Sequence, residues 1–142
     1  MKPRLTFFCE LDPEPLAALM TKPLLDQLRS LDASVSLGLI DLSAERARVV
    51  KRLNRAGIPV IAWLLLPKNE GYWFNTANWL PAARRYGALT TWTAENGLRW
   101  AGVGLDIETD IGEMRQLLAD PLKLAPVLLR RLVDTRQLDR AQ

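Results

Sequence analysis

One stretch of sequence decides the fold: Ile58-Pro59-Val60-Ile61-Ala62-Trp63-Leu64-Leu65-Leu66. The run is almost continuously apolar, which is typical of a strand buried on both faces in a parallel sheet that helices cover. Pro59 fits only at the start of such a strand, because proline cannot donate to the hydrogen-bond ladder. Gly57 stands directly before the run and is placed to end a preceding helix. The stretch therefore predicts a helix that leads straight into a buried strand.

The same order of strand and helix repeats on both sides of this run. Apolar stretches bounded by polar residues predict three more strands, over residues 5–9, 34–40 and 102–108. Helical spacing of apolar residues predicts helices over residues 13–31, 44–56 and 79–95, and again over 114–118 and 127–133. Pro23 should divide the first helix, and Ser43 is a suitable N-cap for the second. Such alternation predicts a parallel α/β sheet.

We expect a sheet of the β/α barrel type with four βα units. A complete TIM barrel needs about 250 residues and eight strands, whereas this chain has 142 residues. We therefore favour a single partial domain over residues 1–142, a half or truncated TIM barrel, above a compact open sheet. Since a half barrel has unpaired sheet edges, we expect self-association or a partner that supplies the C-terminal half.

Composition excludes several classes of function. The chain has no histidine, which removes Ser-His-Asp triads and histidine-based metal sites. Cys9 is the single cysteine and lies in an apolar run, so we expect an inert thiol and no internal disulfide. The net charge is only +3. The basic residues of the second helix, such as Arg46 and Arg48, are interpreted as a solvated face, so we expect no nucleic-acid partner.

No targeting or membrane segment is expected. The first apolar run meets Glu10 and Asp12 before it reaches the length of a signal-peptide core. No apolar stretch approaches the roughly 20 residues that cross a membrane. We expect a cytoplasmic protein with no membrane partner and no cofactor.

The strand over residues 102–108 carries the clearest chemical pattern. Strand side chains alternate between faces, so Gly102, Gly104, Asp106 and Glu108 share one face. The apolar residues between them, expected to pack beneath the helices, are Val103, Leu105 and Ile107. Sites in parallel α/β folds gather where strands end, which places both acids near the mouth of the barrel. Neighbouring carboxylates repel each other, and this favours the protonated form that a general acid requires.

Other polar residues follow the remaining strands. Asp12 and Asp41 stand just before predicted helices and are interpreted as helix caps, whereas Glu10 follows its strand directly. The loop after the third strand combines aromatic rings with amides, which suits the C–H faces and hydroxyl edges of sugars, although the rings could instead form a hydrophobic cluster. The predicted substrate-binding residues are Glu10, Lys68, Asn69, Glu70, Tyr72 and Trp73.

The run Ala101-Gly102-Val103-Gly104-Leu105-Asp106-Ile107-Glu108 resembles the fourth-strand signature of chitinase-type glycoside hydrolases, Asp-Gly-x-Asp-x-Asp-x-Glu. Gly102, Asp106 and Glu108 match it, while Ala101 and Gly104 stand where the first two aspartates belong. The Leu-Asp-Ile-Glu core is also similar to a strand motif of muramidase-type barrels. The resemblance implies a β/α barrel in which Glu108 protonates the glycosidic oxygen and Asp106 orients the substrate or steadies developing charge.

Three functions stay open from the sequence. The first is a carbohydrate-active, glycoside-hydrolase-like protein with Glu108 as general acid and Asp106 as supporting carboxylate. The second is a divalent-metal-dependent phosphodiesterase or lyase, in which Glu10, Asp106 and Glu108 supply oxygen ligands. The third is a truncated barrel without catalytic activity.

Overall fold

The computed structural model describes residues 4–75 and 77–108, which belong to one compact unit. Its elements in chain order are β1 (Thr6–Cys9), α1 (Pro13–Leu19), α2 (Lys22–Ser30), β2 (Ser34–Leu39), α3 (Ala44–Arg55), β3 (Val60–Leu64), the short 3₁₀ helix η1 (Lys68–Glu70), α4 (Trp79–Asn96) and β4 (Gly102–Leu105). The predicted alternation of strands and helices is confirmed. The helices predicted over 114–118 and 127–133 lie outside the described residues.

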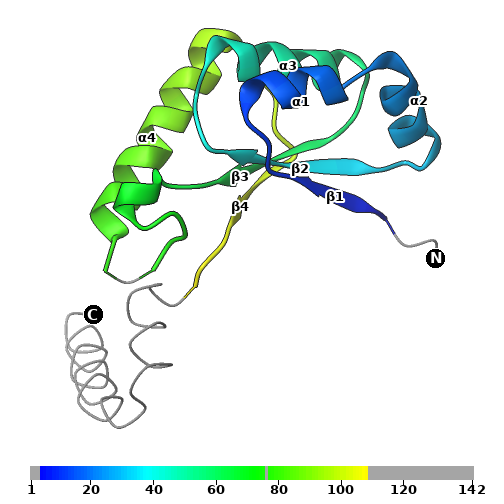
Figure 1. The fold of residues 1–142 in the computed structure, drawn as a ribbon. Helices are drawn as coiled ribbons and strands as arrows, with labels where there is room; N and C mark the ends of the chain where they lie inside the picture. The colour runs from blue at the N-terminus through cyan, green and yellow to red at the C-terminus, as the bar shows by residue number, and fades with distance from the viewer. Residues whose placement is uncertain (1–3, 76, 109–142) are drawn as a thin grey trace, which may run out of the picture. The chain divides into compact units, whose positions relative to one another are not determined.

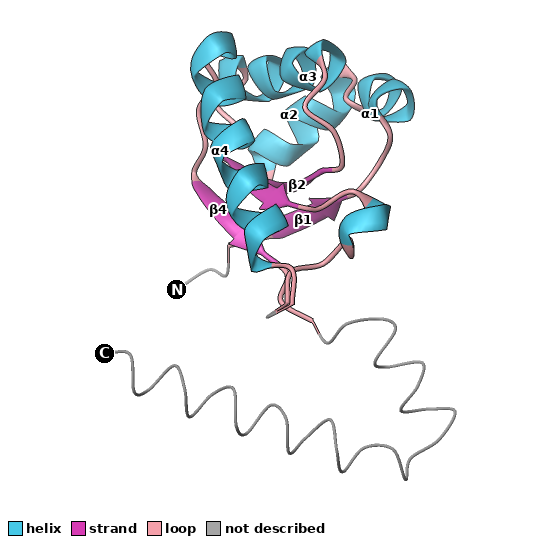
Figure 2. Cartoon of the chain, turned by 90° about the vertical axis from the view of Figure 1, so that its left-hand side faces the viewer, coloured by secondary structure: helices cyan, strands magenta, loops and turns pink. Residues whose placement is uncertain are grey.

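The four strands form one parallel sheet in the order β1-β2-β3-β4. Partner residues include Leu37 with Ala62 and Leu64 with Leu105. Helices α1 to α4 lie over one face of this sheet (Figures 1 and 2). The predicted α/β class with a four-stranded parallel sheet is confirmed. Within the described residues the sheet is not closed, and β1 and β4 form its two edges.

The elements begin and end where local chemistry requires. Pro23 lies in the first turn of α2, so the long predicted helix is divided as expected. The Ser43 hydroxyl accepts a hydrogen bond from the backbone N–H of Arg46 at 3.2 Å and caps α3. Gly97 ends α4 with a φ of 59°, a left-handed conformation that glycine adopts without steric cost.

The hydrophobic core lies between the helices and the helix-facing side of the sheet. Val60, Ala62 and Leu64 of β3 are almost fully buried there. The helices add apolar side chains to the same core, among them Leu16, Leu28, Leu53, Leu89 and Trp92. Each fully buried leucine stabilises the fold by about 1.5–3 kcal/mol. This one-sided core holds the carboxyl ends of the strands in place.

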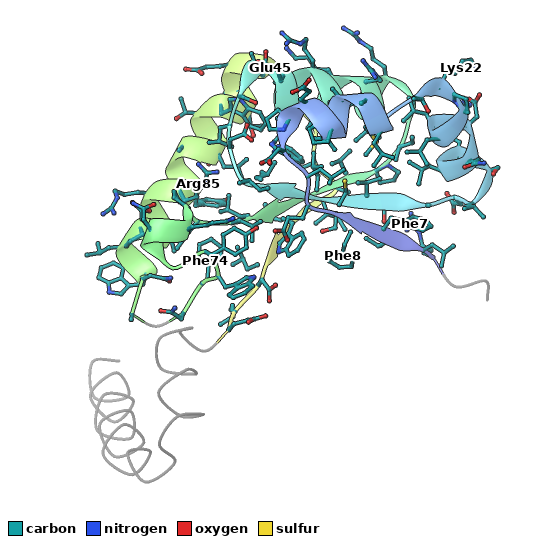
Figure 3. The ribbon with its side chains drawn as sticks, in the orientation of Figure 1. Phe7, Phe8, Lys22, Glu45, Phe74 and Arg85 are labelled. Atoms are coloured by element: carbon teal, nitrogen blue, oxygen red, sulfur yellow. The ribbon has the colours of Figure 1, made fainter. Side chains whose placement is uncertain are left out.

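No described helix covers the opposite face of the sheet, so β3 is covered on one side and not on both as expected. Ile61 and Trp63 of β3 are half-buried on that face. Phe8 of β1 is 71% exposed and points away from the helices (Figure 3). Its ring meets Trp63 edge-on, with 5.6 Å between the ring centroids. The only large side chains on this face of the strands are therefore apolar.

The predicted burial of the apolar residues of β4 is wrong for the described part of the chain. Val103 and Leu105 pair with Ala62 and Leu64, so they lie on the helix-facing side. They are nevertheless 45% and 56% exposed, and Ile107 is 74% exposed. The reason is that β4 is an edge strand over which none of the described helices packs. Among those helices, none combines the length and the apolar character needed to cross a membrane.

Candidate functional site

Glu10 and Tyr72 meet at the carboxyl ends of the strands. Glu10 follows β1, and the phenol of Tyr72 donates a hydrogen bond to its Oε1. Gly38 of β2 makes room for this contact, since a Cβ at that position would lie 3.2 Å from Cγ of Glu10. A side chain there would push against the carboxylate arm. The structure thus brings together two of the predicted substrate-binding residues across the end of β2.

The environment of Tyr72 keeps its phenol protonated. Burial, together with the hydrogen bond to Glu10 and the negative charges of Glu10 and Asp12, raises the pKa of Tyr72 to about 12. At neutral pH the phenol is therefore a hydrogen-bond donor, and the carboxylate of Glu10 is its acceptor. The pair can hold Glu10 in one orientation toward a ligand.

The side-chain amide of Asn78 makes several hydrogen bonds within the loop that presents Tyr72. Asn78 is buried, and its Nδ2 donates to the carbonyls of Trp73 at 2.8 Å and Glu70 at 3.3 Å. Its Oδ1 accepts from the backbone N–H of Asn75 at 2.8 Å. Tyr72 itself has a φ of 62°, which a bulky residue adopts only when its surroundings enforce it. Backbone hydrogen bonds with Leu66 and Pro67 hold Tyr72 there, and Asn78 binds carbonyls on either side of it.

The aromatic residues of this loop separate into different environments. Phe74 is buried, whereas Tyr72 and Trp73 are half-buried and pack edge to face with 5.3 Å between centroids. Trp79, at the start of α4, is 63% exposed. Lys68 and Asn69 are exposed on η1, and Glu70 is half-buried. Tyr72 therefore places a ring beside Glu10, and Trp73 packs against Tyr72.

The acidic segment after β4 is extended, as predicted. The Phe74 N–H donates to the carbonyl of Asp106 at 3.0 Å, and the Glu108 N–H donates to the carbonyl of Phe74 at 2.9 Å. These bonds form a parallel bridge between Phe74 and Ile107. Because side chains alternate along extended backbone, Asp106 and Glu108 project to the same side. Asp106 is half-buried and Glu108 is exposed.

Arg46 is a structural centre that the sequence pattern did not reveal. Its side chain is fully buried, so the interpretation of this residue as part of a solvated helix face is wrong. It donates to Oδ2 of Asp41 at 2.8 and 3.1 Å, to the carbonyl of Gly38 at 2.9 Å and to that of Leu11 at 2.9 Å. The reason is its place in the first turn of α3, directly over the ends of β1 and β2.

Asp41 is not the cap of α3, because that position belongs to Ser43, but its side chain holds the cap residue. Its Oδ1 accepts the backbone N–H of Ser43 at 2.9 Å. Burial opposes ionisation of this carboxyl, but the hydrogen bonds from Arg46 and Ser43 outweigh it and hold the pKa of Asp41 below its usual value. Asp12 is the N-cap of α1 by backbone conformation, without a side-chain bond. The carboxylate of Asp41 is therefore engaged by Arg46 and Ser43, whereas that of Asp12 is exposed and makes no cap bond.

A second arginine binds the ends of β2 and β3. Arg85 reaches from α4 toward the sheet (Figure 3). Its Nε donates to the carbonyl of Leu65 at 3.0 Å, and its Nη2 donates to those of Leu39 at 2.8 Å and Ile40 at 3.1 Å. Carbonyls at strand ends need donors once they leave the ladder, and the two arginines supply them. Helical spacing alone contained no signal for this role.

Two further hypotheses concern the thiol of Cys9 and a metal site. Cys9 is half-buried, and burial raises the pKa of its thiol although the charge of Arg46 partly opposes this. Across residues 4–75 and 77–108, no three acidic or cysteine side chains lie close enough to hold a metal ion. Glu10, Asp106 and Glu108 therefore do not form the oxygen-ligand set that the metal-dependent alternative requires.

The chain was also compared with known proteins. No family model, no curated protein and no solved structure matches it.

Proposed function

We propose that this chain is a half β/α barrel with a carbohydrate-active, glycoside-hydrolase-like site. The observation that carries the proposal is a pair of backbone hydrogen bonds at Phe74. Phe74 donates one to Asp106 and accepts the other from Glu108, and together they hold this segment extended beyond β4. The same loop binds Glu10 through Tyr72. Carboxylates from the ends of β1 and β4 are thus organised by one loop.

The sheet supports the barrel part of the proposal. A doubly wound sheet has helices on both faces and reverses its strand order at a switch point. Within the described residues the strands follow one another in chain order, and helices α1 to α4 cover the same face. That arrangement is the one found in each half of a β/α barrel. The uncovered face, with Phe8 and Trp63, corresponds to the interior of such a barrel.

The chemistry follows from the two kinds of carboxylate. Glu108 is exposed and can reach a glycosidic oxygen as general acid, with Asp106 beside it to steady developing positive charge on the sugar. Glu10 is held as a hydrogen-bond acceptor by Tyr72 and serves as the second carboxylate. The half-buried rings of Tyr72 and Trp73 offer a surface on which a sugar ring can stack.

A chitin-derived oligomer of N-acetylglucosamine tests this proposal. The full chain should bind it and hydrolyse it, and Glu108→Gln should lower turnover by about 10²–10⁴-fold while binding is retained. Glu95→Gln, at an exposed position on α4, is the control and should change neither. Trp73→Ala should weaken binding. Unchanged turnover in Glu108→Gln, or no binding by the unmodified chain, would contradict the proposal.

A further inference from the structure

Within residues 4–75 and 77–108, the sheet has one face and two edges to which nothing is bound. The edges are β1 and β4. The uncovered face is formed by every second residue of the four strands, as the register requires. Its members are Thr6, Phe8, Ser34, Ser36, Gly38, Ile61, Trp63, Gly102 and Gly104.

The chemistry of this face suits burial against another protein surface. None of its members is charged, and the largest are Phe8 and Trp63. Phe8 is 71% exposed. Leaving so large an apolar side chain in water, in the middle of a strand, forgoes the free energy that its burial would contribute. The carboxylates of Glu10, Asp106 and Glu108 come only after the strands, at one end of the face. A partner could therefore cover the middle of the face without burying a charge.

The two edges are complementary to each other. Thr6–Cys9 of β1 and Gly102–Leu105 of β4 have the same length, four residues. All strands are parallel, so β4 of one copy can pair with β1 of another without reversing the chain direction. A two-fold axis along the sheet's strands would create two such pairings and give eight strands. Eight is the number at which side chains just fill the interior of a barrel.

We infer that the uncovered face and both edges bind a second copy of this chain, and that two copies close an eight-stranded parallel barrel. The occupant is a second copy, because it brings edges of the same length, the same four described strands and an uncharged face. In this assembly the strand ends of both copies lie at one mouth. Each copy then adds its own Glu10, Asp106 and Glu108 to a shared site, so the inference rests on the half-barrel part of the proposed function.

The mass of the full chain in solution tests the association. Sedimentation equilibrium should give twice the chain mass of 16.0 kDa. Phe8→Glu should weaken the dimer at least tenfold, because it places a charge inside the closed barrel. Tyr86→Glu is the matched control, since Tyr86 is an exposed aromatic residue on α4 and should leave the dimer intact. A chain that stays monomeric up to its solubility limit would overturn the inference.

Cross-linking tests how the copies pair, without depending on Phe8→Glu. In a Cys9→Ala background, one copy carries Thr6→Cys on β1 and the other carries Gly104→Cys on β4. A short thiol cross-linker should join the two in a mixture and should join neither variant to itself. Cross-links between Thr6→Cys copies alone would mean that β1 pairs with β1, and would overturn barrel closure. These readouts need no sugar, so a dimer without hydrolysis would refute the proposed function only.

Discussion

The phenol of Tyr72 donates its hydrogen bond to Glu10 across 62 residues of sequence. The bond joins the end of β1 to the loop that follows β3. That loop also holds the acidic segment after β4, through the backbone of Phe74. Tyr72 and Phe74 therefore connect the ends of both edge strands, although neither residue belongs to the sheet.

Tyr72 should titrate well above an ordinary tyrosine. Burial, and then the hydrogen bond and charge of Glu10, raise the pKa of Tyr72 from 10.0 to about 12. Since the folded-state pKa is the higher one, the linked stabilisation is complete below pH 10 and is lost as the pH rises through 12. The chain has two tyrosines, so the difference in phenolate absorbance between wild type and Tyr72→Phe reports Tyr72. Tyr86→Phe is the control, and titration of Tyr72 near 10 would contradict the structure.

Arg46→Met should be among the most damaging substitutions in the described chain. It removes donors from Gly38 and Leu11 and leaves Asp41 without its ion pair. Arg46 is buried and Asp41 is partly exposed, so the loss in the free energy of unfolding should approach but not exceed that of a fully buried pair, about 3–5 kcal/mol, measurable by urea denaturation. Arg48→Ala removes an exposed ion pair from the same helix and should lower the free energy of unfolding far less. Equal losses for the two variants would refute the central role of Arg46.

The stabilisation that Asp41 contributes to the fold should be lost in acid. Its pKa is below the ordinary 3.8, because hydrogen bonds from Arg46 and Ser43 outweigh burial. The stabilisation is therefore present above about pH 4 and is lost as the pH falls through the lowered folded-state pKa. Asp41→Asn should be less stable than wild type at pH 7, and the difference should shrink with acidification. A difference that stays constant from pH 7 to pH 2 would show that the charge of Asp41 contributes nothing.

Asn78→Ala should loosen the loop that presents Tyr72. The substitution leaves the carbonyls of Trp73 and Glu70 without their donor and the N–H of Asn75 without its acceptor. The expected loss is about 1–3 kcal/mol, with faster hydrogen exchange at Asn75. Asn69→Ala changes an exposed asparagine of the same loop and should alter neither quantity. Unchanged exchange in Asn78→Ala would mean that the loop keeps its shape without this amide.

Local patterns were sufficient for most elements of the fold. The division at Pro23, the cap at Ser43 and the helix end at Gly57 depend on backbone geometry that each residue imposes by itself. The extended acidic segment after β4 was predictable for the same reason, since alternation is a property of a single strand. The end of β4 was predicted less well. Its pairing with β3 stops at Leu105, and the residues beyond it are held extended by hydrogen bonds with Phe74.

The predictions of side-chain burial were wrong where burial depends on contacts with another helix or strand. Arg46 and Arg48 look alike in the sequence of α3, yet one is buried and the other is exposed. The two arginines lie on different sides of α3. Only the packing of α3 against the sheet decides that Arg46 is the one that faces the backbone carbonyls at the strand ends. Val103 and Leu105 alternate as buried strand residues do, but burial also needs a covering helix.

By itself the sequence determined the order of strands and helices, their parallel arrangement and the extended course of the acidic segment, because periodicity and capping act within a few residues. Only the tertiary structure decided that the helices share one face, that Tyr72 meets Glu10, and that Arg46 and Arg85 bind the strand ends. Such contacts join residues far apart in the chain. They depend on where whole elements pack, and no local pattern of residues encodes that.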